Sequence, residues 1–316
     1  MSKIIERIER EAGVPGLVAL LAERLKPTDL QSLLLEVYRR RAERKTPASL
    51  LADYENDSLV RPSTTSPLRL LQWEQTAFAL LPPDFQPLTL SPVAPLGTCS
   101  IPALVDQNRA LSTIRNNEVL SDSTNVLALE AAQRRQALLK TDPKSVQAVH
   151  LAASHRLLRP QRFPGPNSFS HFAAFALCSA GRDAGNLRFE LATLVTHIGF
   201  YLRALDAFLG PDVPLRLALT DFHADHREAM LENALFAPVQ AAFPRLECGF
   251  DPERTSGQNY YVDLCFHVYA TGPDGAWLEL ADGGVVDWTQ TLLSSAKERC
   301  VISGLGSERL CAVWPG

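Results

Sequence analysis

The chain has 316 residues, of which 46% are hydrophobic and 21% are charged, which predicts a globular protein with a sizeable buried core. The formal net charge of −4 provides no overall basic field, so tight non-specific binding to nucleic acid is not indicated. The N-terminus is charged, and no apolar run approaches the roughly 18 residues that a membrane span requires, so we expect a cytoplasmic protein without membrane association.

Residues 1–60 are predicted to form a small helical module. One helix opens at Pro27–Leu30, with Thr28 as its cap, and another opens at Thr46 and Pro47, with proline in the first helical position. The first of these helices carries apolar residues at helical spacing and ends in arginines that suit its dipole: Leu30, Leu33, Leu34, Val37 and Tyr38, then Arg39, Arg40, Arg41 and Arg44. The arginines could also contact nucleic acid, and the module could cover the sheet, extend a dimer or dock a partner protein.

Turn-forming residues at 60–67 predict a linker, which places the main domain at 61–316. We predict an α+β fold for this domain, with an antiparallel sheet flanked by helices. The helical patterns cover 68–81, 124–140, 187–209 and 224–243, and the strand-like runs cover 85–92, 147–155, 170–178, 214–221, 259–270, 276–282 and 299–305. The sequence Gly272–Gly275 predicts a hairpin turn between two of these strands.

The six cysteines have no CxxC pair, which argues against a zinc ribbon and against a small disulfide framework; they are Cys99, Cys178, Cys248, Cys265, Cys300 and Cys311. We predict reduced thiols that lie mostly in the core. Cys178 could be a nucleophile, but the sequence specifies no base near it, so a core thiol is the preferred interpretation.

A second cluster, Asp221–His226, contains His223, Asp225 and His226 and could suggest a metal site. A pair of ligands three residues apart can face one ion on a helix, but the sequence places no third ligand. The preferred interpretation is therefore a helix start that Asp221 or Asp225 caps. We expect no metal bound by protein side chains alone.

Four separated segments occur in a particular order: Ser154–Gln161 followed by His171–Phe172, then Gly257–Tyr261, Gly283–Asp287 and Gly304–Leu310. They resemble, in the same order and at roughly the same spacing, the second signature motif, the Gly-Leu-Asp-Tyr-Tyr segment, the glycine-rich strand and the third signature motif of histidyl-type class II aminoacyl-tRNA synthetases. The resemblance covers about residues 66–316 and implies the class II catalytic-core fold. Residues 68–92 stand where the family has its dimer-forming first motif, so a homodimer is implied.

The resemblance implies a site for ATP and Mg²⁺. Activation of a carboxylate by ATP develops negative charge on the phosphates, which fixed guanidinium groups stabilise. Arg156 and Arg309 match the family arginines on the α-phosphate and on the γ-phosphate side, and Phe172 matches the aromatic residue that stacks on adenine. Gly304 and Gly306 would allow the backbone to approach the nucleotide closely.

The substrate pocket is implied by the same resemblance. Asp122 and Thr124 match the acid and the threonine of the histidyl Arg-Pro-Glu-Gly-Thr turn, so an amino or cationic substrate could meet Asp122. The other substrate-binding residues that the matched segments imply are Tyr260, Tyr261, Gly283 and Gly284.

The sequence departs from the family where the family recognises adenine, histidine and tRNA. Five functional positions of the family hold different residues here. Leu158 replaces the adenine-binding acid, Ala174 and Cys178 replace the pocket Gln and Glu, and Ser256 and Val285 replace two arginines. Arg254, two residues before Ser256, would have to point in a different direction to replace the arginine that is missing at Ser256. The chain ends six residues after Leu310, and only about 35 residues separate Asp221 from Gly257, so we expect neither the anticodon-binding domain nor the helical insertion that clamps tRNA.

Two functional hypotheses follow. The first is an enzyme that activates a small carboxylic or amino acid as its adenylate for an acceptor other than full-length tRNA. The second is a non-catalytic ligand-sensing or regulatory subunit, similar to the regulatory subunit of ATP phosphoribosyltransferase. The retained arginines Arg156 and Arg309 favour the enzyme, and the departures from the family favour the regulator.

Overall fold

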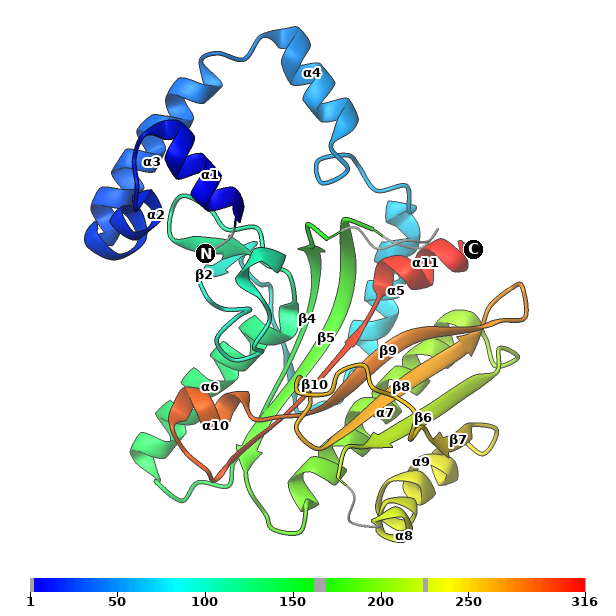
Figure 1. Cartoon of the computed structure of the whole chain (residues 1–316). Helices are drawn as coiled ribbons and strands as arrows, with labels where there is room; N and C mark the ends of the chain where they lie inside the picture. The colour runs from blue at the N-terminus through cyan, green and yellow to red at the C-terminus, as the bar shows by residue number, and fades with distance from the viewer. Residues whose placement is uncertain (1–2, 162–168, 224–226, 316) are drawn as a thin grey trace.

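The computed structural model describes residues 3–161, 169–223 and 227–315. Its centre is an eight-stranded sheet with the order β1-β4-β5-β10-β9-β8-β6-β7, and helices pack on both faces of it (Figure 1). The strands of this sheet are β1 (Phe85–Pro87), β4 (Val149–Leu158), β5 (His171–Arg182), β6 (Leu215–Asp221), β7 (Glu247–Phe250), β8 (Leu264–Thr271), β9 (Trp277–Val286) and β10 (Glu298–Leu305). A separate two-stranded sheet pairs β2 (Val93–Pro95) with β3 (Asn117–Val119).

The helices of the main domain are distributed along its whole length. They are α5 (Pro67–Ala79), the 3₁₀ turn η2 (Gln107–Arg109), α6 (Ser123–Thr141), α7 (Arg188–Leu209), α8 (Glu228–Leu231), the π-helical η3 (Glu232–Phe236), α9 (Ala237–Ala242), α10 (Trp288–Leu293) and α11 (Ser307–Val313). None of the helices in the described part of the chain is long and apolar enough to cross a membrane.

The predicted α+β class with a largely antiparallel sheet is confirmed. The six strands predicted between residues 147 and 305 are all present, with ends shifted by up to five residues. The sheet is mixed, however, because β1 pairs with β4 and β6 pairs with β7 in parallel at its two edges. The strand predicted at 85–92 ends at Pro87, since its later residues leave the sheet, and β7 was not predicted because its four residues carry no clear pattern.

The central strands are buried on both faces, which explains why β5 consists of a nearly continuous run of apolar residues. One face of the sheet packs against α7, where Phe175, Leu194 and Val301 belong to the larger core cluster. The opposite face packs against α6, where Leu127 and Ile302 belong to a second cluster. The sheet therefore separates two hydrophobic cores, and a site at its end receives side chains from both layers.

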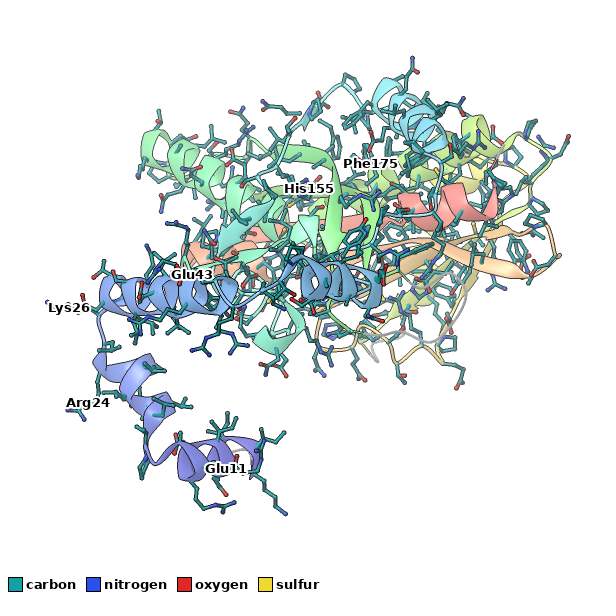
Figure 2. All side chains as sticks on the ribbon, turned by 90° about the horizontal axis from the view of Figure 1, so that it is seen from above. Glu11, Arg24, Lys26, Glu43, His155 and Phe175 are labelled. Atoms are coloured by element: carbon teal, nitrogen blue, oxygen red, sulfur yellow. The ribbon has the colours of Figure 1, made fainter. Side chains whose placement is uncertain are left out.

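Residues 3–56 form an arm of helices that extends away from the main domain (Figures 1 and 2). These helices are α1 (Lys3–Ala12), α2 (Leu17–Ala19), the π-helical η1 (Leu20–Arg24), α3 (Pro27–Ala42) and α4 (Pro47–Asn56). The predicted start of α4 is confirmed, because Thr46 caps it in a reciprocal pair of hydrogen bonds with Ser49. The predicted cap of α3 is wrong: the N-cap is Lys26, and Thr28 already lies inside the helix behind Pro27.

The connection between the arm and the main domain is hydrogen-bonded to the main domain. Ser58 shares a hydrogen bond of 2.9 Å with Ser170, and the carbonyl of Arg61 lies 2.6 Å from Nε2 of His171. Ser63 donates to the carboxylate of Glu308 in α11. The domain boundary predicted at residues 60 and 61 falls within this connection.

Candidate functional site

A cavity of about 870 Å³ lies at one end of the central sheet. Because the inner strands are antiparallel, the carboxyl ends of β4 and β10 lie beside the amino-terminal halves of β5 and β9, and all four strands contribute to its wall. The start of α6, the start of α11 and the loop around η2 complete the lining. Its polar lining residues include Arg109, Asp122, Thr124, Asn125, Arg159, Tyr260, Tyr261, Glu279, Asp282 and Arg309.

Arg309 lies in the first turn of α11 and lines the cavity, as the sequence suggested. Its Nη1 donates a hydrogen bond of 3.1 Å to the carbonyl of Glu279 on β9, which fixes the guanidinium at the cavity wall. Gly304 and Gly306 also line the cavity. A Cβ at either glycine would meet its nearest neighbour at 3.9 and 3.6 Å, which is ordinary contact, so packing within the protein does not require glycine at these two positions.

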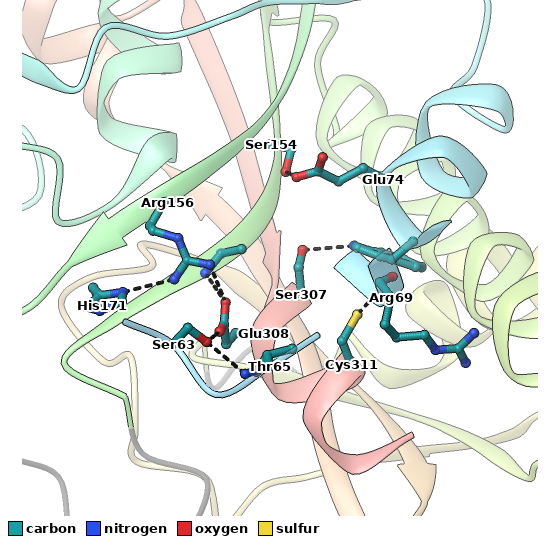
Figure 3. Close-up of polar contacts among 12 residues, drawn as sticks. Ser63, Thr65, Arg69, Glu74, Ser154, Arg156, His171, Ser307, Glu308 and Cys311 are labelled. Carbon is teal, nitrogen blue, oxygen red and sulfur yellow. Dashed lines mark hydrogen bonds and ion pairs between the residues drawn. The ribbon is translucent and has the colours of Figure 1, made fainter. Parts of the chain in front are cut away.

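Arg156 does not line the cavity, contrary to the expectation from the sequence. Side chains alternate along a strand, so Leu157 faces the cavity and its neighbour Arg156 points to the opposite face of β4. There the guanidinium of Arg156 binds Glu308 at 2.9 Å and Nδ1 of His171 at 2.9 Å (Figure 3). The family motif had placed the arginine correctly along the chain, but the face of the strand was decided by the pairing of β4 with β5.

Glu308 is fully buried and holds this second cluster together. Its carboxylate accepts hydrogen bonds from the hydroxyl of Ser63 and from the backbone N–H of Ala173, the latter at 3.1 Å (Figure 3). Burial by itself would raise the pKa of Glu308, but these hydrogen bonds and the charge of Arg156 outweigh it and lower the pKa below its usual value. The Glu308 cluster therefore links α11, β4, β5 and the connection to the arm, so its role is structural.

Arg159 occupies the cavity wall instead, and the sequence analysis did not single it out. Its Nε donates to the carbonyl of Ser121 at 2.9 Å, its Nη2 pairs with Asp122 at 3.3 Å, and its guanidinium lies 5.1 Å from the ring centre of Phe172. Arg109, from the loop around η2, is a further guanidinium in the lining. The signal for Arg159 was its place two residues after Leu157, because the alternation along the strand puts these two side chains on the same face.

Asp122 and Thr124 line the cavity at the start of α6, as expected. Asp122 is the N-cap of this helix, and its Oδ1 accepts from the backbone N–H of Thr124 at 3.0 Å and from the Thr124 hydroxyl at 2.8 Å. Its other oxygen is the one that pairs with Arg159. Both oxygens of Asp122 therefore have partners within the protein.

Tyr260 and Tyr261 line the cavity together with Asp282 of β9. The hydroxyl of Tyr261 donates a hydrogen bond of 2.9 Å to Oδ2 of Asp282. Burial raises the pKa of both tyrosines, and it also raises the pKa of Asp282 and of Glu279. Neither acid was predicted, although an aspartate and a glutamate inside a strand as apolar as β9 were a signal that could have been used.

Gly283 and Gly284 lie outside the cavity, also contrary to expectation. A Cβ at Gly283 would lie 2.4 Å from the Cβ of Ser303, and one at Gly284 would lie 2.4 Å from the carbonyl oxygen of Leu264. These glycines let β9 pack closely against its neighbours, so they have a structural role.

Replacing Gly283 by alanine is therefore expected to lower the free energy of unfolding by about 1–3 kcal/mol, the usual cost of overpacking a tight core. Gly304→Ala is the matched control on the next strand, because its new Cβ has ordinary contacts. Urea denaturation followed by circular dichroism measures both variants. Equal stabilities for the two variants would contradict this placement of Gly283.

The sequence also raised two other sites, a metal site at Asp221–His226 and a nucleophile at Cys178. Within the described residues, no group of three or more His, Cys, Asp and Glu side chains is arranged to hold a metal ion. Asp225 and His226 lie outside the described residues, and Asp221 is bound by Arg227. Cys178 is fully buried with its Sγ 3.8 Å from that of Cys300, and this contact and burial raise its pKa, so the core-thiol interpretation is confirmed.

No protein-family model matches the sequence, and no curated protein matches it either. Three solved structures are similar in fold. The apo histidyl-tRNA synthetase of S. aureus has a TM-score of 0.60 at 14% identity, over 80% of this chain and 68% of that chain. An ATP phosphoribosyltransferase regulatory subunit/histidyl-tRNA synthetase from Bacillus halodurans C has a TM-score of 0.60 at 11% identity, over 81% and 82%. A histidine–tRNA ligase subunit from Alicyclobacillus acidocaldarius has a TM-score of 0.57 at 14% identity, over 81% and 97%.

These likenesses establish the fold that the four sequence segments implied. The chain has the α+β fold of these synthetase-type structures, with a mixed sheet flanked by helices.

Proposed function

We propose that the chain binds ATP and a small carboxylic or amino acid in this cavity and joins them as an acyl adenylate. The observation that carries the proposal is the meeting of three guanidinium groups, those of Arg109, Arg159 and Arg309, in one cavity of a synthetase-type core. A substrate carboxylate matches one of them, and the remaining two match a polyphosphate, whose charge increases at the leaving group as the reaction proceeds.

In this proposal the nucleotide lies at the Arg309 end of the cavity. Gly304 and Gly306 allow its close approach to β10 and α11, and the ring of Phe172 offers a flat apolar face to the adenine. The carboxylate of the acid lies beside Arg159, where it can attack the α-phosphorus while pyrophosphate leaves. Arg159 is then the ligand of the substrate carboxylate, whereas the sequence had suggested the α-phosphate as the ligand of Arg156.

The residues present fit Mg²⁺ bound together with the nucleotide. Mg²⁺ is usually held by one or two carboxylates together with substrate phosphates, and Glu279 provides a cavity-lining carboxylate next to Arg309. When bound, the ion would neutralise the phosphate charge that develops in the reaction. His267, whose Nε2 lies 3.5 Å from the carboxylate of Glu279, supports the side chain from behind.

A second candidate is a ligand-sensing or regulatory subunit that binds the same ligands without chemistry. It is favoured by the position of Arg156, because Glu308 holds this expected phosphate ligand on the far face of β4. One of the structures similar in fold is an ATP phosphoribosyltransferase regulatory subunit/histidyl-tRNA synthetase. In this candidate the ligand would act on the contacts that the protein makes with a partner.

The proposal also includes a homodimer and a protein partner. A homodimer through α5 and β1 is supported by Leu68 and Leu71 of α5, which are 69% and 59% exposed. The arm would bind a protein partner through the apolar residues of α3, of which Val37 and Tyr38 are exposed. Full-length tRNA is not among the proposed partners, and the proposed site of action is the cytoplasm.

The activating function is tested by ATP–pyrophosphate exchange with a panel of amino and other carboxylic acids. We expect exchange with at least one acid, and a decrease of about 100-fold in Arg309→Ala, because a fixed charge at a developing phosphate anion is lost. Arg245→Ala is the matched control, since Arg245 is an exposed arginine of the same domain outside the cavity, and it should retain full exchange.

Calorimetry with ATP separates the two candidates. ATP binding that Arg309→Ala weakens, without exchange for any acid, would support the regulatory candidate and overturn adenylate formation. No ATP binding and no exchange would overturn the placement of a nucleotide in the cavity.

A further inference from the structure

Asp282 carries a carboxylate in the cavity wall that pairs with no cation of the described residues. One carboxylate oxygen accepts the hydrogen bond from Tyr261. In the described part of the chain, no arginine, lysine or histidine forms an ion pair with Asp282, whereas Asp122 caps α6 and pairs with Arg159. The carboxylate of Asp282 therefore faces the cavity with one oxygen available to a ligand.

An uncompensated carboxylate in this environment is costly. A buried charge without a partner costs several kcal/mol, and the phenol of Tyr261 supplies one hydrogen bond but no positive charge. Arg254 lies with its guanidinium 5.8 Å from the Tyr261 ring centre, and it makes no ion pair with Asp282. Its charge does not cancel the effect of burial, which still raises the pKa of Asp282.

Asp282 is the polar member of a row of residues across the sheet, in which Gly304 of β10 lies between Asp282 of β9 and Ala176 of β5. Ala174 and Ala176 of β5 present methyl groups to the cavity, and Cys178, next on the same face, is in the core. In this part of the sheet, Asp282 therefore provides the charged group that a ligand can meet. The rings of Tyr260 and Tyr261, which pack edge to face at 5.0 Å, provide aromatic surface beside the carboxylate and add to the attraction for a cation.

The charges at this end of the cavity indicate the charge of the ligand. Arg159 and Asp122 neutralise each other, and Asp282 adds a carboxylate to the wall that has no ion-pair partner among the described residues. A ligand with a carboxylate at Arg159, an α-ammonium group near Asp122 and a second cation at Asp282 would neutralise it. A neutral imidazole would not, because with an ordinary pKa of about 6.5 it carries little charge at neutral pH.

We infer that Asp282 binds an ammonium or guanidinium group of the substrate, so that the acid taken up by this cavity is a basic amino acid with a side chain charged at neutral pH. The assignment of the substrate carboxylate to Arg159 rests on the proposed function. The assignment of the cation to Asp282 rests on the uncompensated carboxylate itself.

The test is calorimetric binding of lysine, arginine, histidine and norleucine at neutral pH to the full chain, without ATP. Norleucine has the apolar part of the lysine side chain without its charge. We expect lysine or arginine to bind at least about tenfold more tightly than norleucine and histidine, since a charge-assisted hydrogen bond is lost in the neutral ligands. In Asp282→Asn, which keeps an acceptor for Tyr261, this preference should disappear.

Asp274→Asn is the matched control, because Asp274 lies at the exposed turn of the same β8–β9 hairpin and should leave the preference unchanged. Norleucine or histidine bound by the wild-type chain as tightly as lysine and arginine would overturn the inference, and this comparison needs no variant. An unchanged preference in a folded Asp282→Asn would overturn it as well.

The outcomes also separate this inference from the proposed function. Binding of a basic amino acid that depends on Asp282, without pyrophosphate exchange, would uphold the inference and overturn activation. Exchange with a neutral acid and not with basic ones would uphold activation and overturn the inference. Absence of binding for all four amino acids would overturn the inference, whatever the exchange assay shows.

Discussion

Replacing Arg135 by methionine is expected to lower the free energy of unfolding by about 3–5 kcal/mol, because the change leaves a buried carboxylate without its partner. Arg135 of α6 is fully buried, and its Nε and Nη2 bind the two oxygens of Glu298 at 2.8 and 2.9 Å. The same guanidinium donates to the carbonyls of Ser145 and Gln147. This one side chain therefore joins α6, the loop before β4 and the first residue of β10.

Urea denaturation followed by circular dichroism measures this effect, and the next residue provides the control. Arg134 is partly exposed and pairs with Glu130 one turn away, so Arg134→Met should cost less than about 1 kcal/mol. The double variant Arg135→Met/Glu298→Met should recover much of the lost stability, since it removes both charges. A single Arg135→Met variant as stable as Arg134→Met would show that the buried pair contributes little.

The second large effect expected is a loss of stability on acidification, caused by His197. This residue of α7 is fully buried, and its two ring nitrogens hydrogen-bond to the hydroxyls of Ser179 at 2.9 Å and Ser303 at 2.8 Å. Burial lowers the pKa of His197 to about 3, so the imidazole stays neutral in the folded protein. In the unfolded chain an ordinary histidine takes up a proton near pH 6.5.

Proton linkage gives the direction in which the stability changes with pH. Because the unfolded state binds the proton first, stability is greatest above pH 6.5 and falls as the pH decreases from 6.5 toward 3. Between pH 7 and 5 the contribution of His197 is about 2 kcal/mol, at about 1.4 kcal/mol for each pH unit below the unfolded pKa. His267, whose pKa burial lowers to about 4, adds to the same trend.

Denaturant titrations at pH 7, 6 and 5 test this expectation in the wild-type chain and in His197→Gln, which cannot titrate. Most carboxylates remain ionised in this range. The difference between the two proteins in the slope of unfolding free energy against pH therefore gives the contribution of His197. The variant should be less stable at pH 7 and should lose about 2 kcal/mol less on going to pH 5. Parallel curves for the two proteins would mean that His197 becomes protonated without unfolding.

Local signals in the sequence determined the elements and their order. The cap at Thr46, the hairpin turn at Gly272–Gly275 and the apolar periodicity of α6 and α7 depend on neighbouring residues, and the structure has each of them as predicted. The order of the four matched segments was sufficient for the class II synthetase fold. It was also sufficient to place Arg309, Phe172 and the two tyrosines at one cavity, because these residues occupy strand ends and loops that the fold brings together.

Only the tertiary structure decided which side chains face that cavity. A shift of one residue along a strand moves a side chain to the opposite face, so the pairing of β4 directs Arg156 to Glu308 and leaves the cavity to Leu157 and Arg159. Gly283 became a packing residue through its contact with Ser303 on another strand, and Asp282 became a candidate ligand because no cation of the described residues forms an ion pair with it. These outcomes depend on contacts between residues far apart in the chain, which no local pattern specifies.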